Sequence, residues 1–147
     1  MNIDNISIRA GVIRLTATNT FVGILPNGAN QIVGALLTPN LSVGALVFFN
    51  IWGVIVGGAA GNIRAVIDDQ AGGGQVSWAA TAAPSAGNPS QDFPVNTVDA
   101  LTYFTLGVWG VVSTAGQCNL RANLKSFVAG ASLSGVDVVE LQAIIIP

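Results

Sequence analysis

Two stretches decide the fold of this chain: LTYFTLGVWGVVSTAGQCNLRANLKSF at residues 101–127 and DVVELQAIIIP at residues 137–147. Their side chains alternate with the period of two that is typical of β-strands, and a Thr-Ala-Gly turn divides the first stretch. We expect strands over Leu101–Ser113, Gln117–Phe127 and Asp137–Pro147. A chain that ends in a buried strand is expected to fold as a single sheet sandwich.

The strand at 102–113 is unusual because both of its faces carry large apolar side chains. A strand that is apolar on both faces is expected to be buried on both. In a two-sheet sandwich one face meets the opposing sheet, so the other face needs a partner subunit as its cover. One face consists of Phe104, Leu106, Val108 and Val112. The other consists of Tyr103, Trp109 and Val111. By contrast, the strand expected over Gln117–Phe127 has Arg121, Asn123 and Lys125 on one face. That face is expected to be exposed to solvent.

Turn residues divide the rest of the chain into further short strands, giving about eight to ten in all. The expected earlier strands are Ile6–Thr18, Phe21–Leu25, Gln31–Leu37, Val43–Val56 (with a bulge at Gly53), Asn62–Ile67 and Gln75–Thr81. Turns are expected at Pro26-Asn27-Gly28 and Thr38-Pro39-Asn40. The sequence therefore predicts one all-β domain over residues 1–147, a jelly-roll-like antiparallel β-sandwich with almost no helix.

One long segment, Ala82–Asp99, is expected to be irregular because it contains three prolines and two asparagines. Such loops either cross between the sheets or contact a neighbour. Phe93 is its apolar anchor in either case.

Charged residues make up only 8% of the chain, against about 25% in an average globular protein, and hydrophobic residues make up 51%. Five basic and seven acidic residues cannot cover the surface that a domain of this size leaves in water. A free monomer of this kind is expected to self-associate, so we predict an oligomer or a particle component. The basic residues are also scattered, whereas nucleic-acid binding needs clustered phosphate contacts, so no nucleic-acid partner is expected.

The residue types that carry most catalysis are scarce. There is no histidine, which removes the usual general base and metal ligand. The single cysteine, Cys118, is interpreted as a small buried residue on a strand. The pair Asp68 and Asp69 is expected to decorate a turn, with a site for calcium or another hard cation as the alternative. The sequence therefore predicts no enzymatic activity, no cofactor and no metal site.

Membrane insertion is the strongest alternative to a sandwich, because no charged residue occurs from Leu15 to Ile63. The run LSVGALVFFNIWGVIVGGAAG at 41–61 has about the length of a spanning helix. It lacks flanking Lys or Arg, contains Asn50 and ends in a glycine cluster, so a central buried strand is the preferred interpretation. The first residues, MNIDNISIRAG, do not resemble a secretory signal.

The pieces TYFTLGVWGVVSTAG at 102–116, QCNLRANLKS at 117–126 and LQAIIIP at 141–147 resemble the C-terminal half of small jelly-roll domains in tailed-phage structural proteins. These domains are similar in outline to the trimeric tumour-necrosis-factor-like β-sandwich. The resemblance implies a homotrimer on the virion surface that binds viral capsid proteins: a head decoration (cement) protein, a head fibre or a tail-fibre domain. It carries over no functional residue.

Two function classes follow. The preferred one is a decoration protein that stabilises a capsid shell, and a chain that starts at Met1 without a shaft segment fits this expectation. The alternative is a receptor- or glycan-binding tip of a tail or head fibre, and a small capsid protein is less favoured. In the preferred class Trp52, Phe93, Tyr103 and Trp109 are the candidate interface residues.

Overall fold

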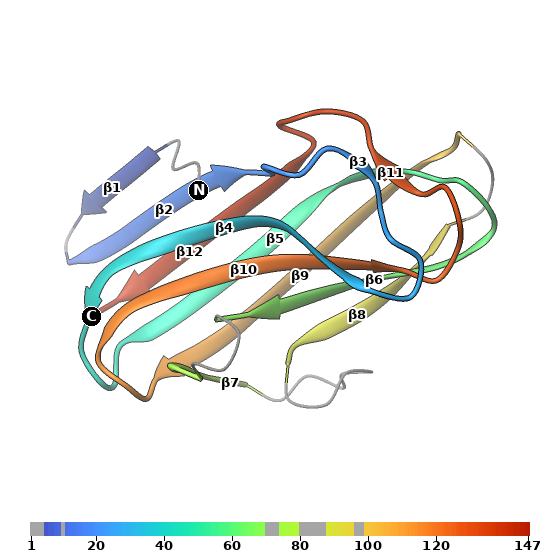
Figure 1. Ribbon diagram of the computed structural model, residues 1–147. Helices are drawn as coiled ribbons and strands as arrows, with labels where there is room; N and C mark the ends of the chain where they lie inside the picture. Colours follow the sequence, from blue (N-terminus) through green and yellow to red (C-terminus); the bar gives the residue numbers. More distant parts are fainter. Residues whose placement is uncertain (1–4, 10, 70–73, 80–87, 96–98) are drawn as a thin grey trace.

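The computed structural model describes residues 5–9, 11–69, 74–79, 88–95 and 99–147, and within them the fold is all-β. Figure 1 shows the strands arranged in two layers. The strands are β1 (Asn5–Arg9), β2 (Val12–Thr18), β3 (Gly23–Ile24), β4 (Asn30–Leu41), β5 (Leu46–Val56), β6 (Gly61–Asp68), β7 (Val76–Trp78), β8 (Ser90–Val95), β9 (Leu101–Val112), β10 (Gly116–Ser126), β11 (Ser132–Leu133) and β12 (Val139–Ile146).

The two layers are an eight-stranded sheet and a four-stranded sheet, and every strand pairing in them is antiparallel. The long strands of the larger sheet lie in the order β2-β12-β5-β9, with β1 and β7 at its edges. The smaller sheet has the order β4-β10-β6-β8. Between β2 and β12 the chain passes back and forth between the sheets, which is the connectivity of a jelly roll. The predicted jelly-roll-like sandwich is therefore confirmed.

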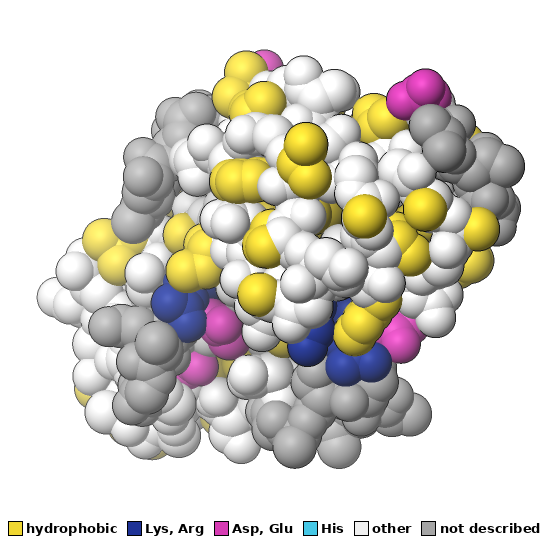
Figure 2. Space-filling model, turned by 45° about the vertical axis from the view of Figure 1, so that its right-hand side comes forward, with side chains coloured by type: hydrophobic (Ala, Val, Ile, Leu, Met, Phe, Trp, Pro, Cys, Tyr) yellow, Lys and Arg dark blue, Asp and Glu magenta, His cyan; other side chains and the backbone are white. Residues whose placement is uncertain are grey.

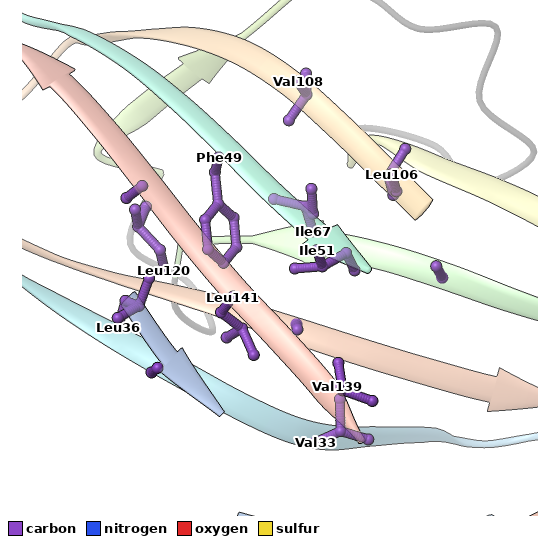
Figure 3. Close-up of a cluster of buried hydrophobic side chains, with 14 of the residues drawn as sticks. Val33, Leu36, Phe49, Ile51, Ile67, Leu106, Val108, Leu120, Val139 and Leu141 are labelled. Carbon is purple, nitrogen blue, oxygen red and sulfur yellow. The ribbon is translucent and has the colours of Figure 1, made fainter. Parts of the chain in front are cut away.

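The hydrophobic core fills the space between the two sheets. Figure 3 shows Phe49 and Leu141 of the larger sheet pointing into the same buried cluster as Leu36 and Leu120 of the smaller one. In β9 every second residue is buried, from Phe104 to Val112, which is the alternation that the sequence predicts for a strand with one face on the core. The three C-terminal strands are accordingly confirmed, with their ends shifted by one or two residues.

Three strand predictions need correction near the N-terminus. The single strand expected over Ile6–Thr18 is a hairpin, because the chain turns at Gly11 between β1 and β2. The strand expected over Phe21–Leu25 shrinks to the two residues of β3. The strand expected from Val43 begins only at Leu46, after a turn that contains Gly44.

The strand β4 continues through Pro39, where the sequence predicted a turn. It is an edge strand, so a residue without an N–H group is tolerated there. The pairing with β10 shifts between Gln117 and Asn119. The N–H of Cys118 in this bulge donates to the Thr38 hydroxyl at 2.9 Å, so the backbone donor is satisfied by a side chain.

Gly53 does not mark a bulge, since β5 keeps its register through Gly53 with both β9 and β12. The glycine is needed for a close approach instead. A Cβ atom at this position would lie 2.5 Å from the carbonyl oxygen of Val138. A side chain here would therefore push the start of β12 away from β5.

The segment Ala82–Asp99 is not wholly irregular, because it contains β8. This strand pairs with β6 at the edge of the smaller sheet, and Pro94 is tolerated at that edge. Residues 82–87 and 96–98 of the expected irregular segment lie outside the described residues. So does the end of the strand expected over Gln75–Thr81, of which β7 is the described part.

The apolar run at 41–61 supplies β5, which lies between β12 and β9 in the larger sheet. Among the described residues, no helix is long and apolar enough to cross a membrane. Within β5 the inward-pointing residues are buried in the core, and the outward-pointing ones are only partly buried.

Candidate functional site

The charged side chains divide unequally between the outer faces of the two sheets. The smaller sheet carries five of them on its strands, namely Arg64, Asp68, Asp92, Arg121 and Lys125. The strands of the larger sheet carry three, Arg9 on the edge strand β1, Arg14 and Glu140, and no side chain of β1 is described. One side of the molecule is thus built to face water, and the other is not.

On the charged side, the acidic groups are paired with basic ones. Arg64 Nε lies 2.7 Å from Asp92 Oδ1, and Arg121 Nε lies 2.5 Å from Asp68 Oδ1. Figure 2 shows Lys and Arg side chains beside Asp and Glu side chains on the face in view. These pairs leave little net charge on this surface with which to attract a charged partner.

The opposite side is the outer face, which we define as the outward-pointing side of β5 and β9 together with the neighbouring part of β12. Neither β5 nor β9 contains a charged residue. Tyr103 is 76% exposed, Leu101 59% and Trp109 48%. The sequence predicted that this side of β9 is covered, and in the isolated chain it is an exposed surface with several large apolar side chains. Contiguous exposed apolar surface is typical of interaction sites.

One end of the outer face is an apolar patch built around Phe48 and Trp109. These residues stand opposite each other on β5 and β9, and their ring centroids are 4.9 Å apart. Gly107 makes room for the Phe48 ring, since a Cβ atom there would lie 3.0 Å from the Phe48 Cζ atom. The patch is completed by neighbours in register on three strands, which are Leu46, Val111, Ile144 and Ile146.

The other end of the outer face holds a pocket of about 540 Å³, here called the Trp52 pocket. Trp52 and Val54 on β5 pair directly with Thr105 and Tyr103 on β9, and all four line it. Its volume falls in the range of small-ligand sites, roughly 300–1,000 Å³. The pocket therefore has room for a group larger than a water molecule.

The remaining walls of the Trp52 pocket differ in polarity. Asp137 and Glu140, both exposed, line the side nearest β12. Phe93 and Phe104 line another part, with ring centroids 5.8 Å apart and in contact with the hydrophobic core. The pocket thus combines aromatic surface with two acidic groups.

The turn that carries Asp137 is held by a buried asparagine. Asn19, which is 1% exposed, accepts hydrogen bonds from the N–H groups of Val138 and Val139, both at 3.1 Å. Its amide nitrogen donates to the carbonyls of Phe21 and Gly135, both at 2.8 Å. Asp137 itself has a φ angle of +65°, a conformation that Asp tolerates better than most residues. The acidic side of the pocket is therefore fixed by the core.

Three of the four residues predicted at an interface, Trp52, Phe93 and Tyr103, line this pocket. Trp109 lies apart from them, in the apolar patch. Phe93 is on β8 and turned towards the core, instead of anchoring an irregular loop. Sequence reasoning missed Asp137 and Glu140, because only the register of β12 against β5 brings Glu140 beside Trp52.

The adjacent carboxylates Asp68 and Asp69 do not form a shared site. Asp68 pairs with Arg121 and accepts a hydrogen bond from Asn123 at 3.0 Å. Asp69 is 5% exposed and accepts a hydrogen bond from the N–H of Val76 at 2.5 Å. Across the described residues, no group of three or more acidic or Cys side chains is placed to hold a metal ion.

Cys118 is fully buried in the core. Burial raises the pKa of its thiol, because the charged thiolate is disfavoured away from water. The thiol is therefore held in its unreactive form, in line with the prediction that it is a packing residue.

No protein-family pattern matches the chain, and no curated protein matches it either.

Proposed function

We propose that this protein is a non-enzymatic structural component of a virus particle, most simply a decoration protein that stabilises a capsid shell. The observation that carries the proposal is the unequal distribution of charge over the two outer faces. A paired, polar surface on the smaller sheet suits contact with water, and an uncharged aromatic face on β5 and β9 suits permanent cover by protein.

Other copies of the same chain are the first proposed partners that bury the outer face. The apolar patch offers two aromatic side chains in contact, with aliphatic neighbours around them, which is the composition of an interface core. A homotrimer is the assembly that the resemblance to phage jelly-roll domains implies. The viral capsid protein is the proposed second partner.

A decoration protein stabilises the shell because it binds preferentially to one of two states. It binds the assembled shell more tightly than free shell subunits, so it shifts the equilibrium towards the intact particle. Since few charges are available on the outer face, binding is expected to be apolar and hydrogen-bonded and to persist at 1 M salt, where the Debye length is about 3 Å.

The experiment compares particles stripped of this protein with the same particles after the purified protein is added back. The proposal predicts that added protein restores resistance to heating, in low and in high salt. Equal resistance with and without the protein removes the stabilising role and favours the receptor- or glycan-binding tip instead.

A further inference from the structure

The Trp52 pocket is lined by two acidic residues, Asp137 and Glu140. Neither Asp137 nor Glu140 takes part in an ion pair within the described part of the chain. Arg14 on β2 stands opposite Ile144, and its guanidinium lies against the Gln142 amide and not against either carboxylate. The pocket therefore favours a positively charged occupant.

The aromatic walls favour the same kind of occupant. Trp52 and Tyr103 line the pocket from neighbouring strands, and the faces of Trp and Tyr rings attract cations within about 6 Å. Val54 and Phe104 offer apolar surface to the stem of such a group. The chemistry that fits is a cation on an apolar chain.

The site is held in place before anything binds. Asn19 fixes the turn with Asp137 from inside the protein, and Gly53 allows the close packing of β5 against the start of β12. A fixed site loses little conformational entropy on binding, so a small occupant can be held selectively.

A second copy of this chain is a poor source of the cation. The described side chains of four of the five basic residues already have their own contacts. Arg64 and Arg121 are in ion pairs, Lys125 lies 5.2 Å from the Phe127 ring centre, and Arg14 lies against the Gln142 amide. These contacts of the four described side chains favour a protein of different sequence as the source of the cation.

We infer that the Trp52 pocket receives an arginine side chain of a partner protein. Arginine fits better than lysine because its guanidinium is planar and weakly hydrated, stacks on aromatic rings and donates in pairs to carboxylates. The identity of the partner as a shell protein rests on the proposed function. The preference for arginine is a property of this chain alone and is tested without particles.

The test is an NMR titration of the intact protein with the peptide acetyl-Gly-Arg-Gly-amide, read at the indole N–H of Trp52. That signal is assigned with a Trp52→Phe variant. The neutral control is the same peptide with citrulline, which has the shape of arginine without its charge. The inference predicts saturable binding of the arginine peptide and at least about tenfold weaker binding of the citrulline peptide.

Two variants locate the charge. Glu140→Gln and Asp137→Asn each remove one carboxylate with little change of shape, and asparagine accepts the φ angle of position 137. Each is expected to weaken binding several-fold. Asp99→Asn is the matched control, because Asp99 is an exposed aspartate with a φ angle of +59° that does not line the pocket.

Equal binding of the two peptides would overturn the inference. So would a loss of affinity in the Asp99 variant equal to that in the Glu140 and Asp137 variants. A neutral sugar that shifts the Trp52 signal when the arginine peptide does not would overturn it as well. None of these touches the proposed function. If the arginine peptide fails to bind and the added protein still protects particles from heat, the inference falls and the proposed function stands.

Discussion

Phe48 and Trp109 face each other across β5 and β9 with ring centroids 4.9 Å apart, on the side of the larger sheet that points away from the core. The two rings are tilted by 41° to each other, and Phe48 is half-buried. Trp109 stays 48% exposed although β9 is paired with β5 at this position. Such a pair is the expected centre of a contact with another protein surface.

Replacing Trp109 by alanine is predicted to weaken self-association, because an aromatic anchor at the centre of an interface contributes about 2 kcal/mol or more, or roughly a 30-fold change in Kd. Sedimentation of the variant over a range of concentrations measures this. Phe127→Ala is the control, since Phe127 is an exposed aromatic residue that follows β10 of the smaller sheet. Equal weakening by both changes would move the contact away from the apolar patch.

Replacing Asn19 by alanine is predicted to destabilise the fold by more than about 2 kcal/mol. The change leaves the N–H groups of Val138 and Val139 and two carbonyls without their partner, and buried polar groups without partners cost about 1–3 kcal/mol each. Urea unfolding measures the loss. Asn40→Ala, at an exposed position of β4, should stay within about 0.5 kcal/mol of the unchanged protein. A loss at Asn19 no larger than that at Asn40 would show that Asn19 does not hold the turn.

Cys118 is predicted to be unreactive towards a thiol reagent in the folded protein, because burial raises the pKa of its thiol and blocks access. The same thiol should react at the rate of a free cysteine once urea unfolds the chain. Fast labelling of the native protein would contradict the placement of Cys118 in the core.

The Arg64–Asp92 pair is predicted to give a small stabilisation that disappears in acid. The hydrogen bond from Arg64 lowers the pKa of Asp92 in the folded protein, so the carboxylate stabilises the fold above its unfolded pKa of about 3.9. The contribution is lost as the pH falls through the lower, folded pKa. Since both side chains are partly exposed, it should stay below about 1 kcal/mol. The free energies of unfolding of the unchanged protein and of Asp92→Asn should differ at pH 7 and approach each other as the pH falls through the folded pKa. A difference that stays the same in acid would contradict this origin.

The strands with a clear period of two were predictable because that signal is local. In β6 and β10, Ile63, Ala65, Leu120 and Leu124 are all buried, as their alternation indicates. Pro39 and Pro94 misled the prediction, since a proline ends a strand only where its missing N–H would be needed. Both prolines lie on edge strands, and no local pattern reveals an edge.

The site was predictable in part for the same reason. Aromatic residues on an uncharged strand mark an outer face that needs cover, so Trp52, Tyr103 and Trp109 could be chosen from the sequence. Their separation into a patch and a pocket could not. It depends on which β12 residue stands beside Trp52, and that register is set by packing between segments far apart in the chain.

The claim that the outer face is made to be covered is tested most directly by sedimentation of the purified protein at micromolar concentration. The account predicts a stable oligomer, a trimer in its simplest form, that persists in 1 M salt because the contact is apolar. A soluble protein that sediments as a monomer under these conditions would contradict it.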